Sequence, residues 1–378
     1  MGHILEDEQL RWCEEHTGEA LALLKELARI PAPTHHEERR AAFVRGWLEA
    51  RGARGVVTDE ARNVLLPLQA EEGPVAVLMA HTDVVFPDTE PLPLREEGGR
   101  VYAPGVGDDT GNLVALLMAA AYCLEHGVRF RHGVVIVANS CEEGLGNLKG
   151  SGAVLDRYAG RVEELISIDG NADRIVDDAV GSHRYRVTIH AQGGHSYNAF
   201  GQTNAIVQMA DLIRALYDRE PPAGAKTTWN VGVIEGGTTV NSICAECSIL
   251  YEYRSASHAC LCEMEAFLRA TLAAFREKGV QVEAEVLGIR PCAVGVDPAR
   301  QTALAQSMKA LQEAEGGCEV TLCPGSTDAN SALGRGIPAV TIGGIRGKGA
   351  HTRDEWIETA SMGPALRITL AALLRYRA

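Results

Sequence analysis

Five separate segments of the sequence supply histidines or acids of the types that bind metal ions and transfer protons. Four of them follow an apolar run: "VLMA", "VVIVANS", "LISI" and, after a glycine-rich loop, "AVTIGG". The fifth is "GVGDDTGN". The candidate residues are His81, Asp83, Asp108, Asp109, Glu142, Glu143, Asp169 and His351. Imidazole nitrogen together with carboxylate oxygen suits zinc, with manganese or cobalt as alternatives.

Each candidate alone also has an ordinary structural explanation. A histidine at a strand end is more often a hydrogen-bonded histidine than a ligand, an acid of "GVGDDTGN" could cap a helix, and Asp169 could belong to a turn. Acids gathered on one edge would repel one another, however, and two divalent cations would remove that repulsion. Asp83 could then accept the second ring hydrogen of His81, and Glu142 could take and return a proton.

The periodicity of apolar residues predicts an α/β sheet that would bring these segments together. Helical patterns occupy residues 7–30, 36–51 and 110–126. The strand patterns "GVVIVANS" and "LISIDG" are apolar on both faces, which is typical of a covered, partly parallel sheet. Strands alternate with helices up to about residue 178, and ligands collect at the carboxyl ends of such strands, so the candidates should share one edge.

The pattern changes near residue 180. "SHRYRVTIHAQ" alternates polar and apolar residues, and the following segments have the order β-α-β-β-α-β, with helices at 204–218 and 258–278. After residue 291 the α/β pattern returns, with a helix near 303–314. We therefore expect a three-layer catalytic domain with a mixed sheet, formed by residues 1–179 and 292–378, and an inserted α+β open-faced sandwich at 180–291.

Composition excludes several classes of protein. The 378 residues exceed what one hydrophobic core usually serves. A net charge of −14 without any Lys/Arg run argues against nucleic-acid binding, and no apolar stretch reaches the ~18 residues that span a membrane. The ten cysteines are scattered along the chain, and the start of the chain is polar and acidic. These features predict reduced thiols and a cytoplasmic protein.

Five motifs taken together resemble those of the dinuclear zinc peptidase and deacylase family: "HTDVV", "GVGDDTGN", "CEEG", "ISIDG" and "GKGAHTRDEW". That family includes peptidase T, carnosinase-type dipeptidases, glutamate-releasing carboxypeptidases, aminoacylase, acetylornithine deacetylase and succinyl-diaminopimelate desuccinylase. The resemblance extends over nearly the whole chain, including the inserted domain. It implies two Zn²⁺ ions per subunit, with Mn²⁺ or Co²⁺ as alternatives.

The resemblance also implies a role for each candidate in the catalytic domain. One metal would be held by His81 and Asp169, and the other by Glu143 and His351. Asp108 would bridge the two metals, because the family's bridging acid directly follows the small residues of that loop, and Asp109 would remain a helix cap. The same motifs assign Glu142 as general acid/base and Asp83 as the residue that orients the histidine.

Further residues resemble the family's substrate-binding segments. In "QGGHSYNAF", His195 would enter the partner subunit's active site and hold the substrate oxyanion; its ordinary explanation is an exposed loop histidine. Asn241 and Arg254 would bind substrate, although Arg254 could equally form a surface salt bridge, and Gly325 and Ser326 would line the substrate carboxylate site. Sharing His195 between chains implies a homodimer formed through the inserted, lid-like domain.

Two positions bear on specificity. Many relatives have Lys where this chain has Thr110, which should alter electrostatics around the metals without removing a ligand. Within the family, Asp at the position of Asp169 accompanies aminopeptidases and dipeptidases, whereas Glu accompanies carboxypeptidases and deacylases.

The sequence therefore predicts a metallopeptidase that hydrolyses the amide bond of a di- or tripeptide. Activation of a water between the metals by Glu142 would start the reaction. The alternatives are a deacylase of N-acyl amino acids or a glutamate-releasing carboxypeptidase, since the catalytic residues are common to all three. A non-catalytic metal- or peptide-binding protein would not need Glu142 beside Glu143. A serine hydrolase lacks support because no GxSxG occurs, and a nucleotide loop lacks support because no Walker lysine follows "GVGDDTGN".

Overall fold

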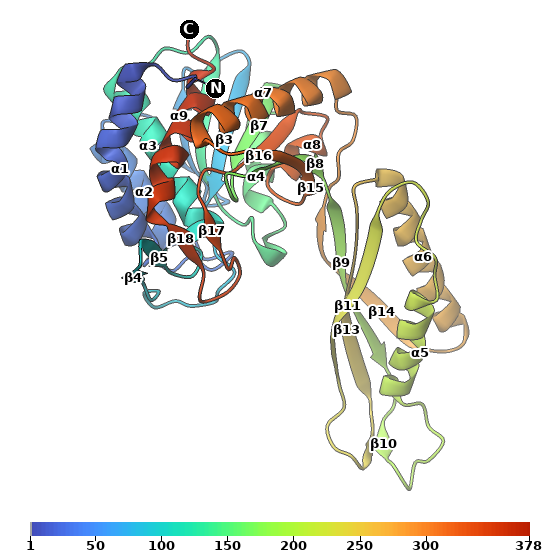
Figure 1. Cartoon of the computed structure of the whole chain (residues 1–378). Helices are drawn as coiled ribbons and strands as arrows, with labels where there is room; N and C mark the ends of the chain where they lie inside the picture. The colour runs from blue at the N-terminus through green and yellow to red at the C-terminus, as the bar shows by residue number, and fades with distance from the viewer. Residues whose placement is uncertain (1) are drawn as a thin grey trace. The chain divides into compact units, whose positions relative to one another are not determined.

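The computed structural model describes residues 2–378, and the chain divides into two compact units (Figure 1). The first unit comprises residues up to Ala179 together with Val294–Ala378, and the second is Val180–Ala293. The inserted unit thus ends at Ala293, where the sequence pattern indicated residue 291.

The first unit is built on a mixed eight-stranded sheet. Across the sheet the strands are β1 (Val57–Thr58), β2 (Val64–Leu68), β6 (Gly133–Asn139), β3 (Val75–His81), β7 (Val162–Ile168), β16 (Ala339–Ile342), β8 (Arg174–Ala179) and β15 (Thr321–Gly325). β6, β3, β7 and β16 run parallel, whereas β8 is antiparallel to β16. Their carboxyl ends therefore meet at one edge of the sheet.

Helices cover both faces of this sheet. They are α1 (Asp7–Leu27), α2 (Glu38–Ala50), α3 (Gly111–Glu125), α4 (Lys149–Arg157), α7 (Pro298–Gly316), α8 (Ala329–Leu333) and α9 (Met362–Leu374). α1, α3 and α9 pack against one another, and α4 packs against α8. Every residue of β3 is buried, although successive side chains point to opposite faces, so both faces are covered. The α/β class and three-layer arrangement predicted from the sequence are confirmed.

Short elements complete the first unit near the edge where the parallel strands end. A small antiparallel sheet consists of β17 (Gly347–Lys348), β18 (Trp356–Glu358), β5 (Arg100–Tyr102) and β4 (Arg95–Glu97). Single helical turns occur at η1 (Val106–Thr110), η2 (Gly144–Gly146) and η3 (Thr359–Ser361). The four strands of the small sheet are only two or three residues long, which is too short for a periodic pattern to appear in the sequence.

The second unit is a four-stranded antiparallel sheet with two helices. The sheet order is β11 (Thr227–Gly236), β13 (Glu246–Ser255), β9 (Gly181–His190) and β14 (Gln281–Arg290). α5 (Ala205–Tyr217) and α6 (His258–Glu277) cover one face, where they bury alternate residues of the strands. A two-stranded ribbon of β10 (Gly194–His195) and β12 (Ser242–Ile243) extends from it. The predicted β-α-β-β-α-β order is confirmed.

Helix bounds agree with the sequence patterns to within a few residues, except at α7. That helix begins at Pro298, after the side chain of Asp297 caps two amides of its first turn, about a turn earlier than the apolar pattern indicated. Among residues 2–378, each helix is too short or too polar to cross a lipid bilayer.

Candidate metal centre

The candidate ligands lie where parallel strands of the first unit end. β3 ends at His81, β7 ends immediately before Asp169, and the loop after β6 supplies Glu142 and Glu143. His351 belongs to the loop between β17 and β18. Buried apolar strands thus deliver polar side chains to one edge, as expected for an α/β sheet.

The structure brings all the predicted ligands together. Within each of three groups, the nitrogen and carboxylate oxygen atoms lie within 4.8 Å of one another. The groups are His81 with Asp108 and Asp169, His81 with Glu142 and Glu143, and Asp108 with Glu143 and His351. Asp108 belongs to a group with each histidine, which is the arrangement that a bridging carboxylate requires.

The His81 ring lies between two aspartates. Its Nε2 is 3.1 Å from Oδ1 of Asp108. Its Nδ1 is 3.1 Å from the main-chain oxygen of Asp83 and 3.5 Å from a carboxylate oxygen of the same residue. The carbonyl of Asp83, rather than the carboxylate expected from the sequence, is therefore the nearest acceptor for the Nδ1 hydrogen. Either contact leaves Nε2 directed at the candidate metal site.

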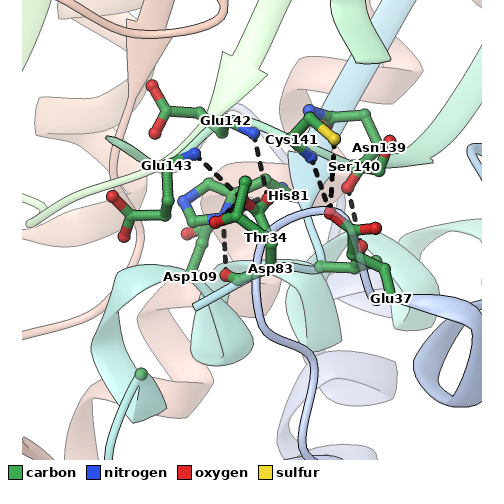
Figure 2. Close-up of polar contacts among 12 residues, drawn as sticks. Thr34, Glu37, His81, Asp83, Asp109, Asn139, Ser140, Cys141, Glu142 and Glu143 are labelled. Atoms are coloured by element: carbon green, nitrogen blue, oxygen red, sulfur yellow. Dashed lines mark hydrogen bonds and ion pairs between the residues drawn. The ribbon is translucent and has the colours of Figure 1, made fainter. Parts of the chain in front are cut away.

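The carboxylate of Asp83 organises the loop that carries the two glutamates (Figure 2). Oδ1 accepts the main-chain N–H of Glu142 at 3.0 Å, and Oδ2 accepts that of Glu143 at 2.9 Å. Oδ2 also accepts the hydroxyl hydrogen of Thr34 at 2.9 Å. Burial alone would raise the pKa of Asp83, but hydrogen bonds from His81 and these amides lower it. Asp83 is consequently a buried anion that fixes the glutamate loop relative to β3.

Glu355 holds the loop of Asp108 in a similar way. Its buried carboxylate accepts the main-chain N–H groups of Gly105, Gly107 and Asp108 at 2.7–2.8 Å. Burial and the charge of Asp108 raise the pKa of Glu355 to about 7. Gly105 has a φ of 69°, and a Cβ there would lie 2.2 Å from Val84, so the loop needs glycine at this position.

Asp109 does not cap the helix, contrary to the expectation from the sequence. α3 begins at Gly111 without a side-chain cap. The buried carboxylate of Asp109 instead accepts the main-chain N–H of His81 at 3.1 Å and the side-chain amide of Asn112 at 2.9 Å. The reason is a tertiary contact. The fold places the buried N–H of His81, at the end of β3, beside Asp109, and the carboxylate provides its hydrogen-bond acceptor.

The charges of the cluster fit a site for divalent cations. Burial and the charge of Asp108 raise the pKa of Asp169 well above its usual range, and burial raises that of Glu143 to about 7. Hydrogen bonds to Asp108 and Glu143 raise the pKa of His351 to about 10. Within residues 2–378, Oε1 of Glu143 is buried without a hydrogen-bond partner. A cluster that holds extra protons to offset its negative charge would exchange them for metal ions.

A cavity of about 350 Å³ adjoins the candidate ligands within the first unit. Its walls include Asp108, Asp169, Asn171, Arg174, Lys348 and Trp356. Two basic side chains thus line a cavity whose other wall contains two of the candidate ligands.

The predicted substrate-binding residues of the second unit lie at opposite ends of its sheet. His195 is exposed on the β10–β12 ribbon, and the main-chain oxygen of Asn241 accepts the N–H of Ser196 at 2.9 Å, so His195 and Asn241 are neighbours. In the pairing of β13 with β9, Arg254 lies opposite Ser182, near the end of β13. The ribbon adjoins the other end of β13, which begins at Glu246. Eight residues of β13 separate Arg254 from Glu246, roughly 25 Å at the usual rise per residue.

Arg254 forms an ion pair inside its own unit. Its Nε and Nη2 donate to the two carboxylate oxygens of Glu252 at 2.9 and 3.0 Å. Back in the first unit, Gly325 pairs with Ala179, and Ser326 follows it; neither lines the cavity beside Asp108. Asp328, two residues after Ser326, accepts the side-chain amide of Asn139, the last residue of β6, at 2.6 Å.

Sequence reasoning missed several polar residues around the centre, all buried except the half-buried Thr34. They are Thr34, Glu37, Arg40, Asn112, Asp328 and Glu355. Glu355 falls inside the motif "GKGAHTRDEW", so its presence there was a signal. Asn112 likewise ends the motif "GVGDDTGN". The other four contact residues that are distant in sequence, which no local periodicity predicts.

A site with two histidines, several acids and an adjacent buried glutamate at strand ends is that of a metallohydrolase. Residues 77–375 match the model of the peptidase family M20/M25/M40, and the chain belongs to this family. The resemblance noted from the motifs is therefore confirmed. The chain is an enzyme, a metal-dependent hydrolase of this family.

Relatives of the chain include both deacylases and peptidases. Succinyl-diaminopimelate desuccinylase of Corynebacterium glutamicum is 25% identical over 347 residues, which cover 89% of this chain and 91% of the relative. Aminopeptidase PepT of Bacillus cereus has the same fold, with a TM-score of 0.70, 21% identity and coverage of 94% and 97%. Bacillus subtilis YxeP, described as a dinuclear metal binding peptidase, has a TM-score of 0.65, 15% identity and coverage of 96% and 98%.

Proposed function

We propose that the chain is a di- or tripeptidase of the aminopeptidase type, which hydrolyses the amide bond of a small peptide with two bound zinc ions. The observation that supports this most strongly is the sharing of Asp108 between two histidine–carboxylate groups, with Glu142 beside them. The family association of Asp at position 169 with aminopeptidases, and the similarity of fold to PepT, also favour a peptidase.

Five side chains would hold the metals. His81 and Asp169 would bind one ion, Glu143 and His351 the other, and Asp108 both. This donor set of imidazole and carboxylate suits zinc, and also manganese or cobalt. When bound, the ions supply Lewis-acid polarisation of the amide carbonyl and of water.

Glu142 would perform the proton transfers. Its side chain is buried beside His81 and Glu143, where it would meet a water that attacks the amide carbon. The carboxylate takes the proton of this water, and returns it to the amine nitrogen as the C–N bond breaks. His195 of a second subunit would stabilise the negative charge that develops on the carbonyl oxygen.

A homodimer would follow from the positions of His195 and Arg254. The register of β13 separates these residues by roughly 25 Å or more within one subunit, too far to contact one small substrate. Two subunits joined through their inserted units could combine His195 and Asn241 of one chain with Arg254 of the other. Arg254 has five N–H donors, so a substrate carboxylate could join Glu252 on the same guanidinium.

A deacylase of N-acyl amino acids is the second candidate. It is favoured by the similarity to a desuccinylase and by the cavity beside Asp108, where Arg174 and Lys348 suit an acyl group or side chain bearing a carboxylate. A glutamate-releasing carboxypeptidase would use the same catalytic residues but lacks an observation of its own.

One experiment decides between these activities. The purified protein would be analysed for metal, stripped with a chelator, reloaded with zinc, and assayed against neutral and acidic dipeptides, tripeptides, and N-acetyl and N-succinyl amino acids. We expect zinc-dependent cleavage of peptides with free amino termini. Cleavage of N-acyl amino acids alone would replace the peptidase with the deacylase, and no zinc-dependent cleavage would reject both.

The same panel tests the cavity. Lys348→Ala should raise KM for acidic substrates about tenfold while leaving neutral ones unchanged, since a lost charge-assisted hydrogen bond contributes about that much. An equal change for both classes would remove Lys348 from substrate recognition.

We also propose that the protein is located in the cytoplasm, a reducing compartment. The ten cysteines are all thiols, which supports this location.

A further inference from the structure

The segment of residues 34–40 runs from the loop after α1 into the first turn of α2, and it directs three side chains inward. They are Thr34, Glu37 and Arg40, spaced three residues apart. Glu37 and Arg40 are completely buried. The segment lies outside residues 77–375, which match the family model, and none of the three is a candidate metal ligand. Each nonetheless contacts a loop that supplies ligands or Glu142.

Thr34 and Arg40 hold the loops after β3 and before α3. The hydroxyl of Thr34 donates to Asp83, the anion that receives the amides of both loop glutamates. Nη1 of Arg40 donates to the main-chain oxygen of Thr82 at 2.9 Å and to the hydroxyl of Thr110 at 3.2 Å. Thr82 follows His81, and Thr110 follows the Asp108–Asp109 pair, so Arg40 ties these two segments to each other.

Glu37 holds the loop after β6 at the residue before Glu142 (Figure 2). Its Oε1 accepts the main-chain N–H of Cys141 at 3.2 Å, the Cys141 thiol at 3.4 Å, and the main-chain N–H of His35 at 2.8 Å. Cys141 has a φ of 58° and His35 a φ of 72°. Both are left-handed conformations that non-glycine residues disfavour. One carboxylate oxygen thus stabilises two unfavourable turns.

The turn at Cys141 determines where Glu142 points. Cys141 is the second residue after β6, and with its left-handed conformation the next two amides both reach Asp83. Without an acceptor, the buried N–H of Cys141 would be left unsatisfied, and the loop would relax toward a commoner backbone conformation. A shift of about 1 Å at a catalytic group can reduce turnover about 100-fold.

We propose that the segment 34–40 is a positioning element for the catalytic loops, and that Glu37 is the positioning residue that sets the location of Glu142 through the turn at Cys141. This inference rests on the proposed hydrolytic function for its catalytic consequence, but the contact itself is independent of that function. Glu37 acts through its reach and the acceptor oxygen Oε1, whereas its Oε2 lies 3.9 Å from Nη1 of Arg62.

Two substitutions separate reach from charge. Glu37→Gln keeps the length and an acceptor oxygen, whereas Glu37→Asp keeps the charge and is one methylene shorter. We expect Glu37→Gln to retain kcat within about threefold, and Glu37→Asp to lose about 100-fold in kcat with KM changed less than about threefold. The matched control is Glu49→Gln, since Glu49 is exposed on the same helix and pairs with Arg45 at the surface; its kcat should equal that of the parent.

Hydrogen exchange in the metal-free protein tests the contact without any assay of activity. A peptide spanning residues 140–144 should exchange slowly in the parent and in Glu37→Gln, and at least tenfold faster in Glu37→Asp. Should Glu37→Asp not fold, Thr34→Val replaces it, because it removes only the hydroxyl donated to Asp83; the expected loss in kcat is about tenfold.

The outcomes distinguish this inference from the proposed function. Equal kcat in Glu37→Asp and the parent, or a larger loss in Glu37→Gln than in Glu37→Asp, would overturn the positioning role. Unchanged exchange at residues 140–144 in Glu37→Asp would do the same. If the parent hydrolyses no amide while the exchange rates change as expected, the proposed function fails and the positioning contact stands.

Discussion

His81 and His351, from the two separate stretches of sequence that form the first unit, face the two oxygens of one carboxylate. Nε2 of His81 lies 3.1 Å from Oδ1 of Asp108, and Nε2 of His351 lies 3.2 Å from its Oδ2. Asp108 is therefore common to two otherwise separate ligand groups. Replacing Asp108 should therefore affect both proposed metal sites, whereas replacing His351 should affect only one.

Metal stoichiometry should follow that asymmetry. His351→Ala removes a ligand from one group only, so we expect a fall from about two bound zinc ions to about one. Asp108→Ala removes a ligand from both groups and should leave fewer than about one. The measurement is mass spectrometry of metal in protein dialysed against trace zinc. Glu49→Ala, which removes an acid paired with Arg45 at the surface, should bind as much zinc as the parent. Equal stoichiometry in the two ligand variants would reject Asp108 as a bridge.

Adjacent glutamates should have different consequences when changed. Glu142→Gln removes the proton acceptor but no proposed ligand, so we expect full metal content with kcat reduced about 10³-fold. Glu143→Gln is the same substitution in the same loop, but it removes a proposed metal ligand. We expect it to release about one zinc ion. Metal content and kcat measured on both proteins provide the comparison. If Glu142→Gln also lost metal, its role would be that of a ligand.

The positions of strands and helices could be predicted because their signals are local. The apolar runs before His81 and Asp169 are buried on both faces, and parallel neighbours end together. Hydrophobic periodicity similarly located α3, which occupies Gly111–Glu125. The convergence of candidate ligands at one edge follows from this topology alone. Specific acids could be assigned to specific metals only through the family resemblance, because spacing does not distinguish Asp108 from Asp109.

Which distant main-chain amides a buried acid satisfies could not be predicted, even where the acid lies inside a motif. Glu355 accepts three amides of the loop before α3, and Glu37 accepts the amide of Cys141. An amide becomes a partner only when folding leaves it buried and unpaired, which no sequence pattern encodes. The same reason explains Asp109, which satisfies the amide of His81 rather than the first turn of α3.

Mixing two inactive variants should restore activity if subunits share their sites. His195→Ala and Arg254→Ala should each lower kcat at least about tenfold, since each removes a charge-stabilising donor. If subunits pair at random, about half of the dimers are heterodimers. One of the two sites in each heterodimer is intact, so the mixture should recover about a quarter of the parent activity. The assay follows turnover after unfolding and refolding the variants together.

A His195→Ala, Arg254→Ala double variant mixed with inactive Glu142→Gln is the control for that recovery. Its heterodimers contain no intact site, because one site lacks Glu142 and the other lacks Arg254. Recovery confined to the first mixture would support sharing between subunits. Absence of recovery in the first mixture, with a dimer present, would place both residues outside a common site.

Asp328 should make stability depend on pH. Burial and the charge of Glu142 raise the pKa of Asp328 to about 7 in the folded protein, against 3.8 for an exposed aspartate. The folded state therefore keeps this proton after the unfolded state has lost it, so stability falls as pH rises from about 4 to about 7 and is level above. Asp328→Asn keeps an acceptor for Asn139 but does not titrate. We therefore expect the unfolding free energy of Asp328→Asn, relative to that of the parent, to increase by about 2–3 kcal/mol from pH 5 to pH 8. Urea titrations of both proteins at each pH measure this difference. A constant difference across this range would show that folding does not raise the pKa of Asp328.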